Sequence, residues 1–80
     1  MQKSLGSRQF ARFLTCLRQA REDAGLTQAA LAQRLGETQS FVSKCERGER
    51  RMDLVELRAF CKAMGLPLAR FVQQFEKGLP

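Results

Sequence analysis

Apolar side chains recur at helical spacing in five segments of the chain, and no segment alternates apolar and polar residues as a strand does. The first segment follows Ser7, a good N-cap residue, and ends at Gly25. Its apolar positions are Phe10, Phe13, Leu14, Leu17, Ala20 and Ala24. Their spacing predicts one long helix that starts after Ser7 and buries a single stripe.

Two shorter segments come next, each preceded by a threonine and followed by a glycine. Thr27 is the predicted N-cap of a helix from Gln28 to about Leu35, and Thr38 caps a helix from Gln39 to about Arg47. Helices of about two turns are not stable alone, so packing must hold both of them. Two short helices joined by a brief turn with a glycine are typical of a helix-turn-helix, here over about residues 28–47.

The last part of the chain predicts two more helices. Asp53 has Glu56 three positions later, which is the capping-box arrangement, and the apolar stripe that follows is Leu54, Leu57, Phe60, Cys61 and Met64. Pro67 suits the first turn of a fifth helix, whose stripe is Leu68, Phe71, Val72 and Phe75. The sequence therefore predicts an all-α fold in one domain over residues 8–77, with a flexible N-terminus over 1–7 and a tail over 78–80.

The helix predicted from Gln39 has distinct inner and outer sides on a helical wheel. Val42 and Cys45 set the buried direction, and the residues that project to the opposite side are Ser40, Ser43, Lys44 and Arg47. Gln39 and Phe41 lie on the two borders. The preceding segment meets the remaining demands of the motif, because Ala32 is small where two helices cross and Gly36 tolerates a tight turn.

This outer side suits the major groove of DNA. Lys44 can donate to guanine, Gln39 can pair with adenine, and Phe41 can lie against a thymine methyl group. Ser40 and Ser43 can serve a base or a phosphate. The alternative is the ordinary solvated side of a surface helix. The spacing of small residues, the lack of acids on this side and the nearby Arg50 and Arg51 favour DNA.

Composition supports a polyanionic partner. The formal net charge is +6 and the pI is about 10.1. No long apolar run and no signal-peptide core is present, so we expect a cytoplasmic protein with no membrane span. The chain has no histidine and three distant cysteines, Cys16, Cys45 and Cys61, which predict buried thiols and no metal site.

Catalysis is not expected. The carboxylates are scattered, no nucleophile has a base at hand, and no glycine-rich phosphate loop is present. The sequence therefore predicts no enzyme, no cofactor and no small-molecule ligand.

The run from Gly25 to Gln28, then Leu31-Ala32 and Leu35-Gly36, then Gln39 to Arg51 resembles the Cro/CI-type (XRE) helix-turn-helix family of phage repressors. The resemblance extends over about Leu14 to Val72. It implies a five-helix, lambda-repressor-like domain that binds double-stranded operator DNA, usually as a dimer. Cys45 departs from the family pattern, which more often has Ile or Val at this position, so the third helix is expected to be anchored somewhat less firmly.

The resemblance also implies residue roles. The base-reading residues would be Gln39, Ser40, Ser43 and Lys44, with Phe41 beside them. The residues expected at the DNA backbone are Thr27, Gln28, Arg47, Arg50 and Arg51, and Gln28 would also brace Gln39. Arg21 and Glu46 fall where family members often hold an ion pair between the first and third helices, although two independent surface charges remain the alternative.

The fifth helix and its tail offer a surface for a homodimer. We expect Phe71 and Val72 to belong mostly to the core and Phe75 and Leu79 to lie at the interface. Phe71 is also expected to contribute to the interface. The sequence favours a transcriptional regulator, a repressor or a controller, on a palindromic operator. The alternative is a protein-interaction module of the same fold, such as an antitoxin or anti-repressor subunit.

Overall fold

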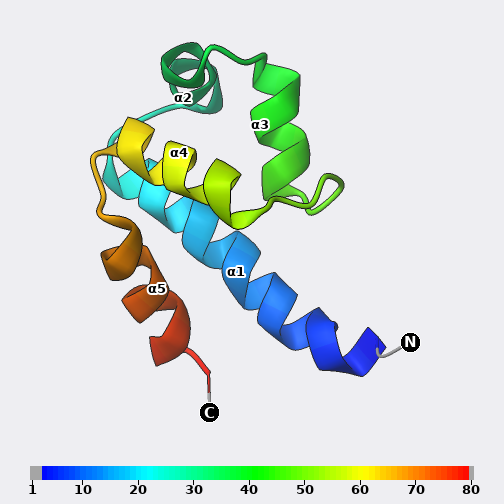
Figure 1. Cartoon of the computed structure of the whole chain (residues 1–80). Helices are drawn as coiled ribbons and strands as arrows, with labels where there is room; N and C mark the ends of the chain where they lie inside the picture. The colour runs from blue at the N-terminus through cyan, green and yellow to red at the C-terminus, as the bar shows by residue number, and fades with distance from the viewer. Residues whose placement is uncertain (1–2, 80) are drawn as a thin grey trace.

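The computed structural model describes residues 3–79, and over this range the chain folds into five α-helices with no strand. The helices are α1 (Lys3–Asp23), α2 (Gln28–Leu35), α3 (Gln39–Glu46), α4 (Leu54–Met64) and α5 (Leu68–Lys77) (Figure 1). α2 packs against α3 and α4, while α1 packs against α3 and α5. The predicted all-α, five-helix fold is confirmed.

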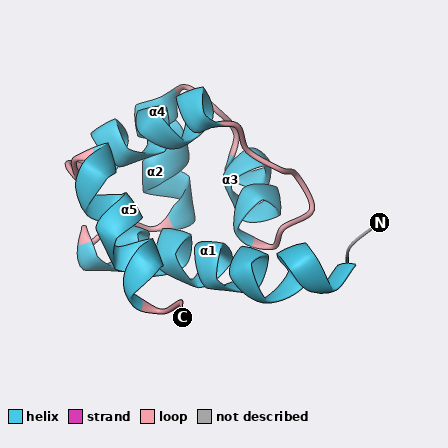
Figure 2. Cartoon of the chain, turned by 60° about the horizontal axis from the view of Figure 1, so that its bottom comes forward, coloured by secondary structure: helices cyan, strands magenta, loops and turns pink. Residues whose placement is uncertain are grey.

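The views agree on how the ends of the molecule are arranged. α3 and the loop that follows it lie on one side, and α5 lies on the opposite side (Figure 2). The long α1 runs between them and extends past both towards the N-terminus. The helix-turn-helix is therefore held at one end of the protein, apart from the last helix.

The first helix begins earlier than the sequence predicts. It starts at Lys3, so Ser7 lies inside the helix and is not its N-cap. No proline interrupts residues 3–7, and Gly6 costs only about 1 kcal/mol relative to alanine inside a helix that is already nucleated. The predicted flexibility of residues 1–7 stays a prediction, and residues 1–2 lie outside the described range.

The helix caps follow the sequence closely. The Thr27 hydroxyl accepts from the Ala30 N–H at 3.0 Å, and the Thr38 hydroxyl accepts from the Phe41 N–H at 3.1 Å. The carboxylate of Asp53 accepts from the Glu56 N–H and the carboxylate of Glu56 accepts from the Asp53 N–H, so the predicted capping box is present. These bonds satisfy N–H groups that a helix start leaves unpaired.

All five helices contribute to one core. Its fully buried side chains come from α1 to α4 and are Leu17, Leu31, Val42, Cys45, Phe60 and Cys61. Phe71 joins them from α5 with 2% of its surface exposed. The three cysteines are free and buried, and burial raises the pKa of the Cys45 and Cys61 thiols. Those two thiols are therefore protonated and unreactive at neutral pH.

Three residues of the predicted apolar stripes are exposed instead. Ala24 lies just past the end of α1, and the other two lie within helices. Leu54 is 65% exposed in the first turn of α4, and Val72 is 42% exposed on α5. Each lies roughly 70° around its helix from the centre of the buried stripe, at 100° per residue. The core reaches Phe60 and Phe71, but it does not extend around to these borders.

Candidate nucleic-acid interface

The orientation of α3 agrees with the helical wheel. Val42 is fully buried and Cys45 is 1% exposed, so both anchor the helix to the core. Gln39, Ser40, Lys44 and Arg47 are exposed, and Ser43 is half-buried. Ala32 is 2% exposed where α2 packs against α3, as its small size predicts. The polar side of α3 is therefore open to a partner.

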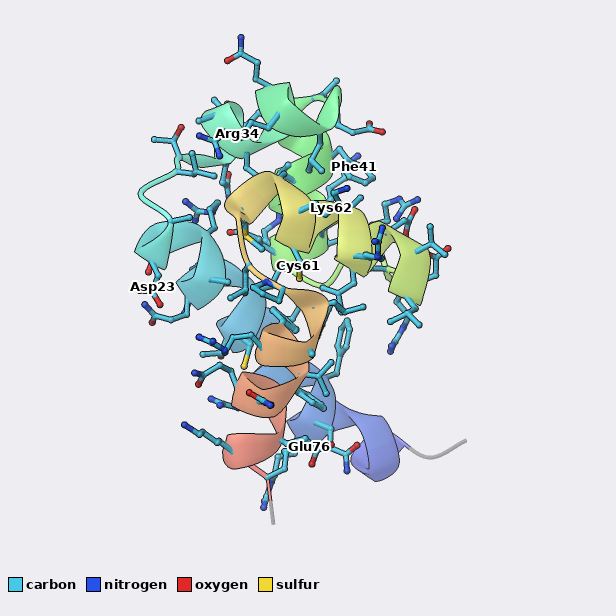
Figure 3. The ribbon with its side chains drawn as sticks, turned by 60° about the vertical axis from the view of Figure 1, so that its left-hand side comes forward. Asp23, Arg34, Phe41, Cys61, Lys62 and Glu76 are labelled. Carbon is cyan, nitrogen blue, oxygen red and sulfur yellow. The ribbon has the colours of Figure 1, made fainter. Side chains whose placement is uncertain are left out.

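Phe41 is less available than the sequence suggests. Its ring lies 6.1 Å from the ring of Phe60, centroid to centroid, and the Arg50 guanidinium carbon lies 4.8 Å from the Phe41 centroid. Phe41 is thus half-buried between the core and an arginine, close to α4 (Figure 3). A base can reach only the part of the ring that these neighbours leave uncovered.

The predicted ion pair between Arg21 and Glu46 is present and joins α1 to α3. Arg21 donates from Nε to Glu46 Oε2 at 2.6 Å and from Nη2 to Oε1 at 3.1 Å. Arg21 Nη1 also donates to the Leu26 carbonyl at 2.8 Å. The two side chains are 12% and 5% exposed, and the hydrogen bond that Arg21 donates to Glu46 raises the pKa of Arg21. This pair ties the C-terminal end of α3 to α1.

Gln28 braces a different residue from the one expected. Its Nε2 donates to Glu46 Oε1 at 3.0 Å, and the structure gives no bond from Gln28 to Gln39. Glu46 accepts two hydrogen bonds from Arg21 and still has free lone pairs. These lie near the start of α2, so the side-chain amide of Gln28 can donate to the carboxylate. The Thr27 hydroxyl accepts a bond as the N-cap, so its own proton is left to donate outward.

The basic residues after α3 have internal partners that the sequence analysis missed. Arg47 pairs with Glu49 at 2.9 Å and also donates to the Ser43 hydroxyl. Arg50 donates from Nη1 to Glu56 Oε1 at 3.1 Å and from Nη2 to Oε2 at 2.8 Å. These arginines keep further donors, but a phosphate would have to share them with a carboxylate.

Arg51 has an aromatic partner. Its guanidinium carbon lies 4.2 Å from the centroid of the Phe10 ring on α1. The short spacing from Arg47 to Glu49 is a signal that the sequence offered. The Arg50–Glu56 pair and the Arg51–Phe10 contact depend on the path of the loop, which no periodicity reveals.

A separate groove of about 480 Å³ lies between α1, the α4–α5 turn and α5. Residues from α2 and α3 do not line it, so it is distinct from the helix-turn-helix. Among the described residues no cluster of three or more His, Cys, Asp or Glu side chains could hold a metal ion. None of the helices in the described range combines the length and the apolar composition that a membrane span requires.

Comparisons with known proteins agree with this geometry. The family model of the helix-turn-helix domain matches residues 12–71. The structure is similar to an XRE-family like protein from Pseudomonas syringae pv. tomato, with a TM-score of 0.88 and 40% sequence identity. That match covers 98% of this chain and 95% of the other.

A second solved structure is similar over most of its length. It is the clp gene regulator ClgR from C. glutamicum, with a TM-score of 0.77 and 25% identity, and the match covers 86% of this chain and 90% of that one. No curated protein matches the sequence.

Proposed function

Because this chain belongs to the XRE family of helix-turn-helix DNA-binding regulators, we propose that it binds a palindromic operator as a homodimer and represses or controls transcription there. The observation that supports this most is the orientation of α3. Its anchors Val42 and Cys45 are buried, while the donor-rich side with Ser40 and Lys44 is open. A helix presented in this way fits the major groove.

We assign base reading to residues at the start and on the outer side of α3. Gln39 and Lys44 offer amide and ammonium donors, and Ser40 and Ser43 offer hydroxyl groups. Phe41 has a smaller role, limited to its uncovered edge. These residues would distinguish one operator from another.

The proposed backbone contacts flank α3 on both sides. Thr27 and Gln28 lie at the start of α2, where unpaired N–H groups and the helix dipole favour a phosphate. Arg47, Arg50 and Arg51 follow on the other side, in the basic loop. With a net charge of +6, such contacts would make the affinity fall steeply with salt.

For the homodimer we propose the outer surface of α5. Val72 is exposed, and Phe75 and Leu79 are half-buried, so these residues extend one apolar surface along the last helix and its end. Phe71 is not included in the proposed dimer interface, because a side chain buried in the core of its own protomer has little surface left for a second one. A dimer would let two copies of α3 read successive half-sites.

In vitro selection of sites from random duplexes tests this function. We expect a palindromic consensus whose half-sites lie about one helical turn apart, roughly 10 base pairs between centres. Recovery of one unpaired half-site would contradict the dimer but keep specific DNA binding. No enrichment over the starting pool, at low salt and high protein concentration, would contradict DNA reading. It would favour a protein-interaction module of the same fold.

A further inference from the structure

A carboxylate lies beside the proposed reading surface and holds one of its arginines. Arg47 donates from Nε to Glu49 Oε2 at 2.9 Å and from Nη2 to Oε1 at 3.2 Å. Arg47 Nη1 donates to the Ser43 hydroxyl one turn earlier. Glu49, Arg47 and Ser43 therefore form a continuous chain along the second half of α3.

The backbone places Glu49 there. After α3 the Gly48 N–H donates to the Cys45 carbonyl at 3.1 Å, and the Glu49 N–H donates to the Lys44 carbonyl at 2.9 Å. These two bonds, with Gly48 at a φ of +78°, make a Schellman motif. The residue after the glycine is thereby brought back over the end of the recognition helix.

Helix stability does not account for an acid at this position. A carboxylate near a helix C-terminus opposes the helix dipole. The side chains of Arg47 and Glu49 are 53% and 55% exposed, and exposed ion pairs contribute little to stability. The hydrogen bond from Arg47 holds the pKa of Glu49 below its usual value, and the charge of Lys44 lowers it further. Glu49 is therefore ionised at neutral pH among the cations expected to meet DNA.

Given the DNA-binding function proposed above, we infer that Glu49 is a specificity-determining residue. It competes with a DNA phosphate for the Arg47 guanidinium, and so weakens the backbone contact proposed for this arginine. Binding to arbitrary DNA depends almost wholly on phosphate contacts, so nothing there offsets the weakened contact. Binding to the operator also uses base contacts, including that of Ser43, which the same chain of bonds orients. Glu49 thus lowers the affinity for arbitrary DNA more than the affinity for the operator.

The test compares Glu49→Gln with Asp23→Asn and the parent protein. Asp23 is exposed at the end of α1, away from the outer side of α3 and from the proposed dimer surface, so its substitution removes the same charge at a distance (Figure 3). Affinities are measured by fluorescence anisotropy for the selected operator duplex and for a scrambled duplex of equal length, at several salt concentrations. We expect Glu49→Gln to raise the affinity for the scrambled duplex by roughly three- to tenfold, with a steeper salt dependence. Operator affinity should change less, and Asp23→Asn should leave the ratio of the two affinities unchanged.

A double substitution tests whether the effect of Glu49 depends on Arg47. In the Arg47→Ala background, Glu49→Gln should no longer raise the affinity for the scrambled duplex, because the released donor is gone. An unchanged affinity of Glu49→Gln for the scrambled duplex would overturn the inference, as would an equal gain on both duplexes. A parent protein that does not distinguish operator from scrambled duplex would instead contradict the proposed function, and the parent measurement alone shows this.

Discussion

At the scale of single residues, the loop after α3 depends on one glycine. Gly48 has a φ of +78°, and a Cβ built there would lie 2.9 Å from Leu14 Cδ1 and 3.0 Å from Phe10 Cε2. Gly36 has a similar φ of +71°, but a Cβ there would meet nothing within 4 Å. The two glycines share a backbone conformation and differ in their surroundings.

We therefore expect Gly48→Ala to destabilise the protein more than Gly36→Ala. The left-handed conformation costs an alanine about 1 kcal/mol at either site. At Gly48 the added contact with α1 should bring the total loss to about 2–3 kcal/mol. Urea denaturation of both variants measures the difference. Equal losses would show that α1 does not press against this loop.

Glu56 makes a pH-dependent contribution to the stability of the folded protein. The hydrogen bond from Arg50, and then that from the Asp53 N–H, lowers its pKa in the folded protein. Because the folded pKa lies below the unfolded one, the contribution is full above the unfolded pKa of about 4.5 and disappears as pH falls through the folded pKa. We expect Glu56→Gln to be less stable than the parent at pH 7, with the gap in thermal midpoint closing towards pH 3. A gap that is constant with pH would contradict this.

At the scale of helices, sequence periodicity predicted most of the structure. Thr27, Thr38 and Asp53 mark the starts of α2, α3 and α4 because a cap is a local hydrogen bond, legible from a few residues. The start of α1 was predicted too late, since a cap residue permits a helix start without requiring one. Leu54 and Val72 were misplaced because periodicity cannot show how far the core extends.

Contacts between distant helices were harder to foresee. Arg12 donates to the Phe75 carbonyl at 3.3 Å and Arg34 to the Ala63 carbonyl at 2.8 Å, so two arginines cap the ends of α5 and α4. These bonds join residues far apart in the sequence, so no local sequence pattern predicts them. The Arg21–Glu46 pair was predicted from the family resemblance and not from periodicity, and the structure confirms it.

That pair should be the strongest link between α1 and α3. Arg21→Met leaves the Glu46 carboxylate nearly buried, with Gln28 as its remaining side-chain partner. We expect a loss of about 3 kcal/mol in the free energy of unfolding. Arg21→Met with Glu46→Leu should recover much of this loss, because no unpaired charge is left in the protein. A double variant as unstable as the single one would show that packing, and not charge, holds α3 in place.

At the scale of the whole molecule, two exposed apolar surfaces compete for a partner. One runs along α5 through Val72, and the other is the first turn of α4, where Val55 is 77% exposed beside Leu54. The surface on α5 extends over about two helical turns, whereas the other is bordered by the Arg50–Glu56 pair. The dimer should therefore use α5.

Matched substitutions separate these surfaces. We expect Val72→Asp to be monomeric in sedimentation velocity at concentrations where the parent is a dimer, and Val55→Asp to remain dimeric. The converse result would move the interface to α4. A monomeric parent at tens of micromolar would contradict a dimer that forms without DNA.

The proposed function depends on base reading by the outer side of α3, and one comparison tests this most directly. In vitro selection is repeated with Lys44→Ala and with Lys62→Ala, which removes the same charge from an exposed position on α4 (Figure 3). We predict that Lys44→Ala relaxes the preference at one base pair of each half-site, losing about 1–3 kcal/mol of discrimination, while Lys62→Ala recovers the parental consensus. A Lys44→Ala protein that selects the same consensus as the parent, with undiminished preference at every base pair, would contradict the account.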